Sequence, residues 1–419
     1  MIGIIIFALA ILGAPLFAVI AAYALNGFHG SGMGISGVIL EINRIVDTPV
    51  LLSIPLFTFA GYIMGESGTP RRLVALSRAL LGWMPGGLAI VTLTVCAMFT
   101  ALTGASGVTI VAMGALLYPA MLSEGYPEKF SLGLVTTSGS LGLLFPPAIP
   151  LILYGVIAQT SIDKMFLAGI LPGILMVVLL SAHSLYNGRK FKIPLQKFHW
   201  KEVFSSMRAA AWELPLPVIV LGGVYSGYFA ISESAAVTAF YVMIVEVFIY
   251  KEVRLRDLPS VMRRSMTLVG GILIIVGMSL ASTNYMIDQQ VPAKLFDFVK
   301  SNISSAFTFL VVLNVFLLIL GCLLDIFSAI VLVVPLLLPI AKSYGIDPIH
   351  MGIIFLANMQ IGYCTPPIGM NLFIASYRFK QPVVKLYWAT MPFLAILLGV
   401  VLIITYWPWL TMVLTQFIR

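Results

Sequence analysis

Two stretches of this sequence, GLLFPP at Gly142–Pro147 and GYCTPP at Gly362–Pro367, each put a glycine and a Pro-Pro pair inside a long apolar run. A helix cannot continue through either stretch, because proline lacks an amide hydrogen and disfavours helical geometry at the residue before it. Carbonyl groups near each break therefore lose their helical partners. Inside a bilayer, such carbonyls must be satisfied by the protein or by a ligand. The two stretches predict a pair of broken membrane helices.

The two breaks belong to an internal repeat. The first proline of each pair, Pro146 or Pro366, gives an offset of 366 − 146 = 220 residues. The same offset superposes Gly125 on Gly345 and Pro119 on Pro339. A run of matches at one offset indicates a duplication, and duplicated halves are typical of transporters.

The composition indicates a polytopic membrane protein. Of the 419 residues, 60% are hydrophobic and 10% are charged, and the mean hydropathy is +1.05, whereas about a quarter of a soluble domain is charged. The net charge of +8 does not predict nucleic-acid binding, because its distribution fits orientation in a lipid bilayer.

Signals for an enzyme are absent from the sequence. It has no GxxxxGK[ST] motif to hold phosphates, and its 4 histidines are isolated. The three cysteines lie in apolar runs without paired spacing, which predicts neither disulfides nor a transition-metal site; they are Cys96, Cys322 and Cys364. We expect no catalytic residue and no organic cofactor.

Apolar segments predict the membrane spans. The candidates are Ile2–Leu25, Pro49–Gly65, Gly86–Leu122, Phe130–Ala158, Met165–Tyr186, Trp212–Tyr228, Ile231–Tyr250, Met266–Ile287, Ala306–Ala341, Ile349–Tyr377 and Tyr387–Val413. Two of them, Gly86–Leu122 and Ala306–Ala341, would exceed about 50 Å as straight helices, whereas the hydrocarbon core is roughly 30 Å thick. Both are interrupted near the middle, at Thr103–Gly107 and at Gly321–Asp325. We therefore expect re-entrant hairpins with their tips near the bilayer centre.

The basic residues predict the orientation. If each hairpin returns to the side it enters from, six of the 24 basic residues face one side and 24 − 6 = 18 face the other. The six are Arg44, Lys164, Lys294, Lys300, Lys342 and Arg419. The positive-inside rule then puts the N-terminus in the cytoplasm and the C-terminus outside. The hairpins open to opposite sides, so the repeats are inverted, and the basic stretch Arg189–Arg208 is expected to be a helix on the membrane surface.

Backbone and hydroxyl oxygens gather at the tips and breaks. The first half supplies Thr103, Ser106, Gly142, Phe145 and Pro147, and the second half supplies Gly321, Gly362, Thr365 and Ile368. Cages made mostly of carbonyls suit a dehydrated cation of single charge, so each half predicts a site for sodium rather than for a proton. The alternative is that these glycines and prolines only permit close packing and a kink.

Polar side chains near the same crevice are candidates for substrate contacts: Ser106, Thr109, Asp325, Asn358 and Asn371. An ionisable residue deep in a membrane, such as Asp325, is costly and usually serves an ion, a substrate or a partner. Asp325 is alternatively the cap of the second hairpin helix, and each neutral residue alternatively bridges two helices. We interpret Glu233 as a helix cap.

Family motifs extend over nearly the whole chain. They are IPLFTFAG (Ile54–Gly61), TPRRLV (Thr69–Val74), TGASGVT (Thr103–Thr109), FPPAIPLILYG (Phe145–Gly155), FLAGILPG (Phe166–Gly173), SESAAV (Ser232–Val237), RDLP (Arg256–Pro259), GCLLD (Gly321–Asp325) and TPPIGMNLF (Thr365–Phe373). With these motifs the chain resembles the large membrane subunit, the DctM-like M subunit, of the tripartite ATP-independent periplasmic (TRAP) transporters in the ion transporter superfamily. Many relatives have an aspartate where this sequence has Thr109, so their substrate contacts do not transfer directly.

The resemblance implies an elevator-type transport domain that moves against a scaffold and binds sodium at the residues named above. It implies scaffold helices and an amphipathic connector in residues 1–85 and further scaffold in 159–305. The transport domain would comprise 86–158 (hairpin 86–122, broken helix 130–158) and 306–378 (hairpin 306–341, broken helix 349–377), followed by a C-terminal helix in 379–419. It also implies two partners, a small four-helix membrane subunit and a periplasmic substrate-binding protein.

The sequence thus predicts a sodium-coupled importer of a small organic anion, a carboxylate or a sulfonate, in the bacterial inner membrane. One alternative is a stand-alone sodium/dicarboxylate-type symporter of the same superfamily, which needs no binding protein. A channel or a structural membrane subunit is the alternative from another class, and paired broken helices argue against it.

Overall fold

The computed structural model describes residues 5–6, 8–9, 14–30, 36–46, 48–193 and 197–417. Over these residues the regular secondary structure is helical and no strand is present. Eight of the helices described are long and apolar enough to cross a membrane, or nine if one bent pair is a single span. The prediction of an all-α polytopic membrane protein is confirmed. Ile2 and Arg419, which entered the predictions above, lie outside the described residues.

The N-terminal part differs from the single span predicted at Ile2–Leu25. Ala14 and Pro15 are not helical, and the next helix starts directly after Pro15, since proline disfavours helical geometry at the residue before it. The elements that follow are α2 (Leu16–Gly30), α3 (Ser36–Val46), η1 (Pro49–Leu52), α4 (Ser53–Glu66) and α5 (Thr69–Leu81). Together η1 and α4 form the predicted second span.

The first half of the repeat contains the predicted hairpin and break. Its elements are α6 (Gly87–Thr103), α7 (Ser106–Ser123), α8 (Glu128–Ser138), η2 (Leu141–Leu144) and α9 (Ile149–Ile157). Helix α6 ends at Gly104, whose φ of 67° lies in the left-handed region that glycine adopts without strain. At the break the helix axis bends by 44° between η2 and α9.

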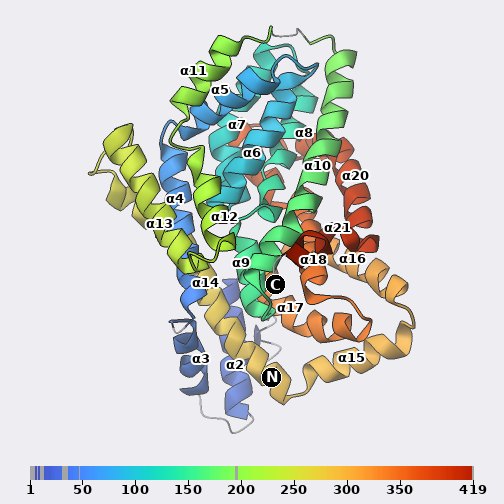
Figure 1. Ribbon diagram of the computed structural model, residues 1–419. Coiled ribbons are helices and arrows are strands. Elements are labelled where there is room, and N and C mark those ends of the chain that lie inside the picture. Colours follow the sequence, from blue (N-terminus) through green and yellow to red (C-terminus); the bar gives the residue numbers. More distant parts are fainter. Residues whose placement is uncertain are drawn as a thin grey trace.

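The second half repeats this order as α16 (Ala306–Leu323), α17 (Ile326–Ser343), α18 (Pro348–Gly362) and α19 (Met370–Phe379). Helices α7 and α17 begin 326 − 106 = 220 residues apart, the offset of the sequence repeat. The Ser140 hydroxyl donates to the Gln360 carbonyl at 3.3 Å, and these two residues are also 220 apart. The two halves therefore meet at equivalent positions, with their hairpins toward opposite ends of the molecule (Figure 1).

Seven helices of the described chain connect the two halves. They are α10 (Ile162–Lys190), α11 (Trp200–Ala209), α12 (Pro215–Tyr225), α13 (Ile231–Met243), the π-helix η3 (Ile244–Ile249), α14 (Leu258–Asp288) and α15 (Val291–Asn302). The stretch Arg189–Arg208, predicted as one surface helix, contains the last residues of α10, described residues that are not helical and most of α11. Helix α11 buries Val203 and exposes Trp200 and Phe204. The predicted cap at Glu233 is confirmed, because its carboxylate accepts from the Ala230 amide at 2.9 Å.

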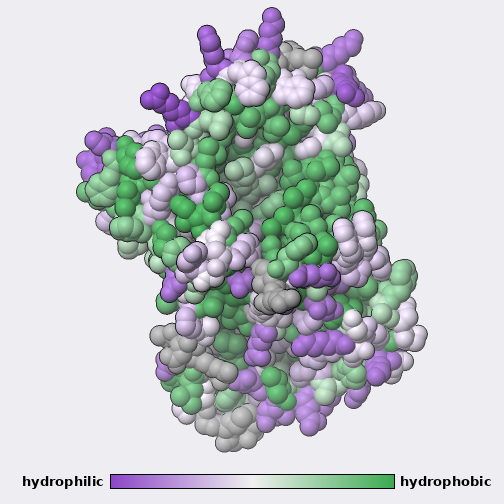
Figure 2. Space-filling view, viewed as in Figure 1, coloured by the Kyte–Doolittle hydropathy of each residue, from purple (hydrophilic) through white to green (hydrophobic). Residues whose placement is uncertain are grey.

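The chain ends with α20 (Val383–Tyr406), α21 (Trp409–Met412) and η4 (Leu414–Phe417). Helix α20 packs against α8, α10 and α18, so it lies with the hairpins and breaks. On the other side α4 packs against α13 and α14, and α14 against α2 (Figure 1). On the face shown in Figure 2, apolar side chains form a broad band across the middle of the molecule, as expected for a surface in contact with lipid. The domain boundaries drawn from the sequence stay a prediction.

Candidate functional site

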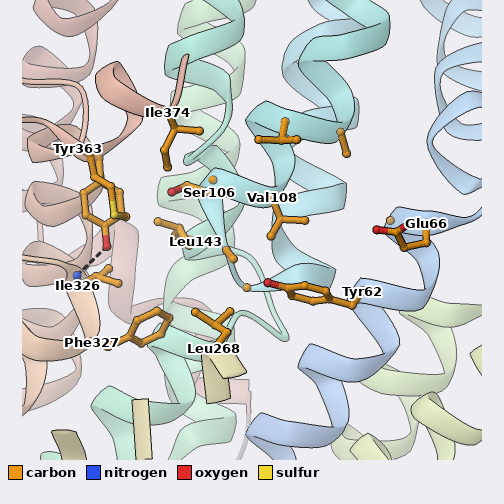
Figure 3. A pocket seen from close by; sticks show the side chains of 17 residues that line it. Tyr62, Glu66, Ser106, Val108, Leu143, Leu268, Ile326, Phe327, Tyr363 and Ile374 are labelled. Atoms are coloured by element: carbon orange, nitrogen blue, oxygen red, sulfur yellow. Dashed lines mark hydrogen bonds between the residues drawn. The ribbon is translucent and has the colours of Figure 1, made fainter. Parts of the chain in front are cut away.

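A cavity of about 500 Å³ lies where both hairpin tips and both breaks meet α4 and α14 (Figure 3). Each of these elements contributes to its lining, with Tyr62, Ser106, Leu143, Leu268, Ile326 and Tyr363 as examples. Small-molecule sites commonly have volumes of about 300–1,000 Å³ and largely apolar walls with a few polar groups. This cavity is therefore the candidate functional site.

Helix N-termini converge on the cavity. Helix α7 begins at Ser106 and α19 begins at Met370, and in the described part of the chain neither has a side-chain cap. The unpaired amides of a helix N-terminus and the helix dipole favour an anion. The third N-terminus, that of α17, is already occupied, because Asp325 accepts hydrogen bonds from the amides of Phe327 and Ser328 at 3.0 Å each. Of the two interpretations of Asp325, the structure supports the cap.

A hydrogen bond between the two halves fixes the first hairpin tip. The Ser106 hydroxyl donates to Asn371 Oδ1 at 2.8 Å, and both side chains are buried. Neighbouring Gly107 packs closely on α19, since a Cβ there would lie 2.8 Å from Ile374. The tip of one half is thus held by the helix that leaves the break of the other half. Two of the predicted substrate residues, Ser106 and Asn371, are brought together here.

The first set of predicted sodium ligands lies on one tip and one break. A Cβ on Gly142 would lie 2.5 Å from the Ala101 amide nitrogen, so this break touches the end of α6. The carbonyls of Gly142 and Phe145 each accept one backbone hydrogen bond at 3.0 Å, which leaves each a second lone pair. The Thr103 hydroxyl is buried and has no hydrogen-bond partner among the described residues. The Pro147 side chain is buried as well.

The second predicted sodium site has the same design. A Cβ on Gly362 would lie 2.5 Å from the Gly321 backbone, so this break touches the end of α16. The Gly362 carbonyl accepts from the Thr365 amide at 3.0 Å, and the Thr365 hydroxyl donates to the Ile361 carbonyl at 3.0 Å. Ile368 differs from the rest, because its side chain is exposed. The Tyr363 hydroxyl accepts from the Ile326 amide at 2.6 Å and ties this break to the second tip.

Two of the predicted substrate residues lie away from the cavity. Thr109 is fully buried, and its hydroxyl is 2.6 Å from the Thr100 hydroxyl, inside the first hairpin. Asn358 is fully buried as well and donates to Asn314 Oδ1 at 2.7 Å, between α18 and α16. Both match the alternative interpretation, in which a polar residue bridges helices.

The chain's similarity to known proteins agrees with this geometry. Residues 3–410 match the sequence profile of the family described as "Tripartite ATP-independent periplasmic transporter, DctM component". The chain belongs to this family. It is therefore a multi-pass membrane protein and a large permease subunit of TRAP type.

Several DctM-family relatives carry names that state a substrate. The C4-dicarboxylate TRAP transporter large permease protein DctM of Pseudomonas aeruginosa is 37% identical over 369 residues, 88% of this chain and 86% of the relative. The isethionate TRAP transporter permease protein DctMQ of Oleidesulfovibrio alaskensis is 36% identical over 87% of this chain and 58% of its own length. The ectoine/5-hydroxyectoine permease UehC of Ruegeria pomeroyi is 33% identical over 96% of this chain and 94% of the relative.

A solved structure of the Alcanivorax borkumensis YdaH transporter has a similar fold. Its TM-score is 0.62 at 14% sequence identity, over 88% of this chain and 87% of that one. The likeness supports the arrangement of helices in this DctM-family chain.

A buried ionic cluster was not predicted from the sequence. Arg72 of α5 contacts Glu213, Glu246 and Glu252, the last two at 3.1 and 2.7 Å, and its guanidinium lies 3.8 Å from the ring centre of Tyr250. Burial alone would lower the pKa of Arg72, but hydrogen bonds and the neighbouring carboxylates raise it, so Arg72 stays charged. The cluster joins the start of α5 to η3, to the segment after η3 and to the segment before α12. Glu246 was a detectable signal, because it lies inside an apolar span.

Proposed function

We propose that this chain carries a small organic anion across the membrane, coupled to sodium, by an elevator movement of the hairpins and breaks. The observation that carries the proposal is the cavity at which two uncapped helix N-termini meet. An anion bound there would be stabilised by the amides at the start of α7 and by the dipoles of α7 and α19, while the Ser106 hydroxyl holds the tip in place through Asn371.

Sodium binding is supported by the oxygen atoms available at the first tip and break. The buried Thr103 hydroxyl, which has no hydrogen-bond partner in the described chain, gives a reason for a ligand at this position, because unpaired buried polar groups are costly. The Gly142 and Phe145 carbonyls have lone pairs to spare. Hydroxyl and carbonyl oxygens suit a hard cation of single charge. Gly321, Gly362, Thr365 and Ile368 would form the second site.

Coupling would follow from the shared position of the sites. The first tip and the second break, which would each hold sodium, also carry the N-termini of α7 and α19 that would hold the anion. Ordering them around sodium would therefore prepare the anion site. In this structure the cavity runs along α7 from Ser106 to Val111 and Ala112. It thus extends from the tip toward the end of the molecule that holds α5 and α11, which the positive-inside rule makes cytoplasmic.

The names of the relatives support the choice of substrate and partners. C4-dicarboxylates and isethionate, a sulfonate, are small anions, and they are the substrates in the names of two relatives. We propose that a periplasmic binding protein delivers the anion and that a small membrane subunit completes the transporter. We also propose a cytoplasmic N-terminus and a periplasmic C-terminus in the inner membrane.

Uptake into proteoliposomes tests the proposal. The chain, its small subunit and its binding protein would be reconstituted, and uptake of labelled succinate or isethionate would be measured under an inward sodium gradient and a matched potassium gradient. We expect saturable uptake that needs sodium and falls at least tenfold in Ser106→Ala. Equal uptake under both gradients would contradict sodium coupling, and uptake without the binding protein would favour a stand-alone symporter.

A further inference from the structure

The cavity contains a charge that does not suit an anion. Of the described residues that line it, Glu66 is the one that carries a charge. It lies on the last turn of α4, one helical turn from Tyr62, whose ring points toward the first hairpin tip (Figure 3). A carboxylate facing an incoming anion repels it, and the repulsion is stronger where water is displaced. Something must neutralise Glu66 if anions are to use this cavity.

Arg264 of α14 supplies the opposite charge. Its Nη1 donates to Glu66 Oε1 at 2.8 Å. Both side chains are about half exposed, with exposed fractions of 48% for Arg264 and 45% for Glu66. Ion pairs this exposed contribute only about 0–1 kcal/mol, so they open and re-form easily. The pair keeps the wall formed by α4 and α14 neutral. Because it opens easily, Arg264 can leave Glu66 and bind another anion.

The position of the pair places it on a route out of the cavity. Moving along α7 from Ser106 to Ala112 leads away from the tip and stays in the cavity lining. Glu66 is the last residue of α4, just before α5. Helix α5 and the C-terminus of α7 lie at the same end of the molecule (Figure 1). An anion that leaves the tip toward this end passes the wall of the cavity that carries Glu66.

We propose that Arg264 and Glu66 form an exchange pair for the leaving anion. The inference rests on the proposed function. As the anion moves away from the N-termini of α7 and α19, its carboxylate or sulfonate replaces Glu66 on the Arg264 guanidinium, and Glu66 then displaces the anion into water. Arg264 draws the anion out, and Glu66 prevents it from staying bound. Neither residue touches the anion at the tip.

A cysteine reporter measures the charge of the wall without any substrate. Val108 lines the cavity, and the native thiols Cys96, Cys322 and Cys364 are buried, so Val108→Cys provides an accessible thiol and the parent chain provides the blank. The purified chain reacts with anionic 2-sulfonatoethyl or cationic 2-(trimethylammonium)ethyl methanethiosulfonate, and the thiolate forms a mixed disulfide while methanesulfinate leaves. Both reagents react with the same thiolate, so the ratio of the anionic to the cationic reaction rate does not depend on the thiolate fraction. The ratio therefore reports the local electrostatic potential.

Neutralising Arg264 and neutralising Glu66 should change the rate ratio in opposite directions. Arg264→Gln lowers the anionic-to-cationic rate ratio by about threefold or more, and Glu66→Gln raises it by a similar factor, as expected for one unit charge within roughly a Debye length. The double variant Glu66→Gln/Arg264→Gln restores the ratio, which also shows that the fold is intact. Arg263→Gln is the matched control, because Arg263 is the adjacent exposed arginine on α14 and makes no ion pair within the described structure. A ratio that stays constant in both single variants overturns the proposal.

Transport assigns the role of the pair. With succinate or isethionate, whichever the wild type carries, we expect at least a fivefold loss of turnover in Arg264→Gln and none in Arg263→Gln. In Glu66→Gln both KM and turnover fall, because the anion leaves more slowly. Unchanged transport in both pair variants refutes the exchange role while the proposed function stands. If the wild type carries no anion, the proposed function fails, and the reporter ratio still decides whether the pair controls the charge of the wall.

Discussion

Close backbone contact between tip and break can be tested by adding one methyl group at a time. A Cβ on Gly142 would lie 2.2 Å from the Ala97 carbonyl oxygen, and a Cβ on Gly362 would lie 2.5 Å from Gly321 Cα. On Gly321 the nearest atom would be 3.1 Å away, at Gly362 Cα. Carbon atoms at optimal separation are about 3.5–4.0 Å apart. The atoms in the way belong to the backbone, so they cannot turn aside as a side chain would.

The distances set the expected order of effects. Overpacking a well-packed site costs about 1–3 kcal/mol, and we expect Gly142→Ala and Gly362→Ala at or above the upper end of this range. Gly321→Ala should cost about 1 kcal/mol, near the lower end. Gly399 in α20 is the control, because no described atom lies within 4 Å of its Cβ position. Gly399→Ala is expected to be neutral or to stabilise by up to about 1 kcal/mol, since alanine is the better helix former.

Unfolding of the purified variants in detergent measures this series. The free energy of unfolding, or the midpoint of thermal unfolding at matched lipid and detergent, should decrease in the order Gly399→Ala, Gly321→Ala, Gly362→Ala, Gly142→Ala. Stability equal to wild type in both Gly142→Ala and Gly362→Ala would refute the claim that the breaks and tips are in backbone contact.

Three further predictions concern single interactions. Replacing the largely buried Arg72 by Gln leaves the buried Glu213 and Glu246 without their cationic partner and should cost about 3–5 kcal/mol, whereas Gln at the exposed Arg71 should cost little; similar unfolding curves for the two variants would contradict the cluster. Asp325→Ala should lose about 1 kcal/mol through its cap, and Asp325→Asn, which keeps an acceptor, should lose less in the same denaturation assay. Ser106→Ala leaves the buried Asn371 oxygen without its donor and should cost about 1–3 kcal/mol, against no measurable change for Ser123→Ala on the exposed end of the same helix.

The repeat could be predicted from sequence because it depends on local backbone chemistry. Proline disfavours a helix because it lacks an amide hydrogen and restricts the residue before it, although single prolines such as Pro119 and Pro172 are accommodated inside α7 and α10. Glycine ends a helix where a left-handed residue is needed. Gly104 and the two Pro-Pro pairs therefore located the tips and breaks, and the offset of 220 located the second set from the first. The same rule, applied to Pro15, would have shortened the first predicted span.

The contacts between halves could not be predicted in this way. Ser106 and Asn371 are 265 residues apart, and no local pattern pairs them. Whether a polar residue faces a cavity or a neighbouring helix depends on the packing of both halves, which is why Thr109 and Asn358 were predicted as substrate residues although they bridge helices. Arg264 and Glu66 belong to a wall that only the fold brings to the cavity.

The most direct test of the account is the effect of sodium on stability. Thermal unfolding of the purified chain would be compared in sodium and potassium at equal ionic strength, for wild type, Thr103→Val, Thr365→Val and the control Thr92→Val, whose hydroxyl is bonded to the Leu88 carbonyl within α6. A ligand present at a hundred times its Kd stabilises the folded state by about 2.7 kcal/mol. We predict a sodium-specific rise in wild type and in Thr92→Val that is reduced in Thr103→Val and Thr365→Val. Equal stability in the two cations, or an equal rise in all four proteins, would contradict sodium binding at the tips and breaks.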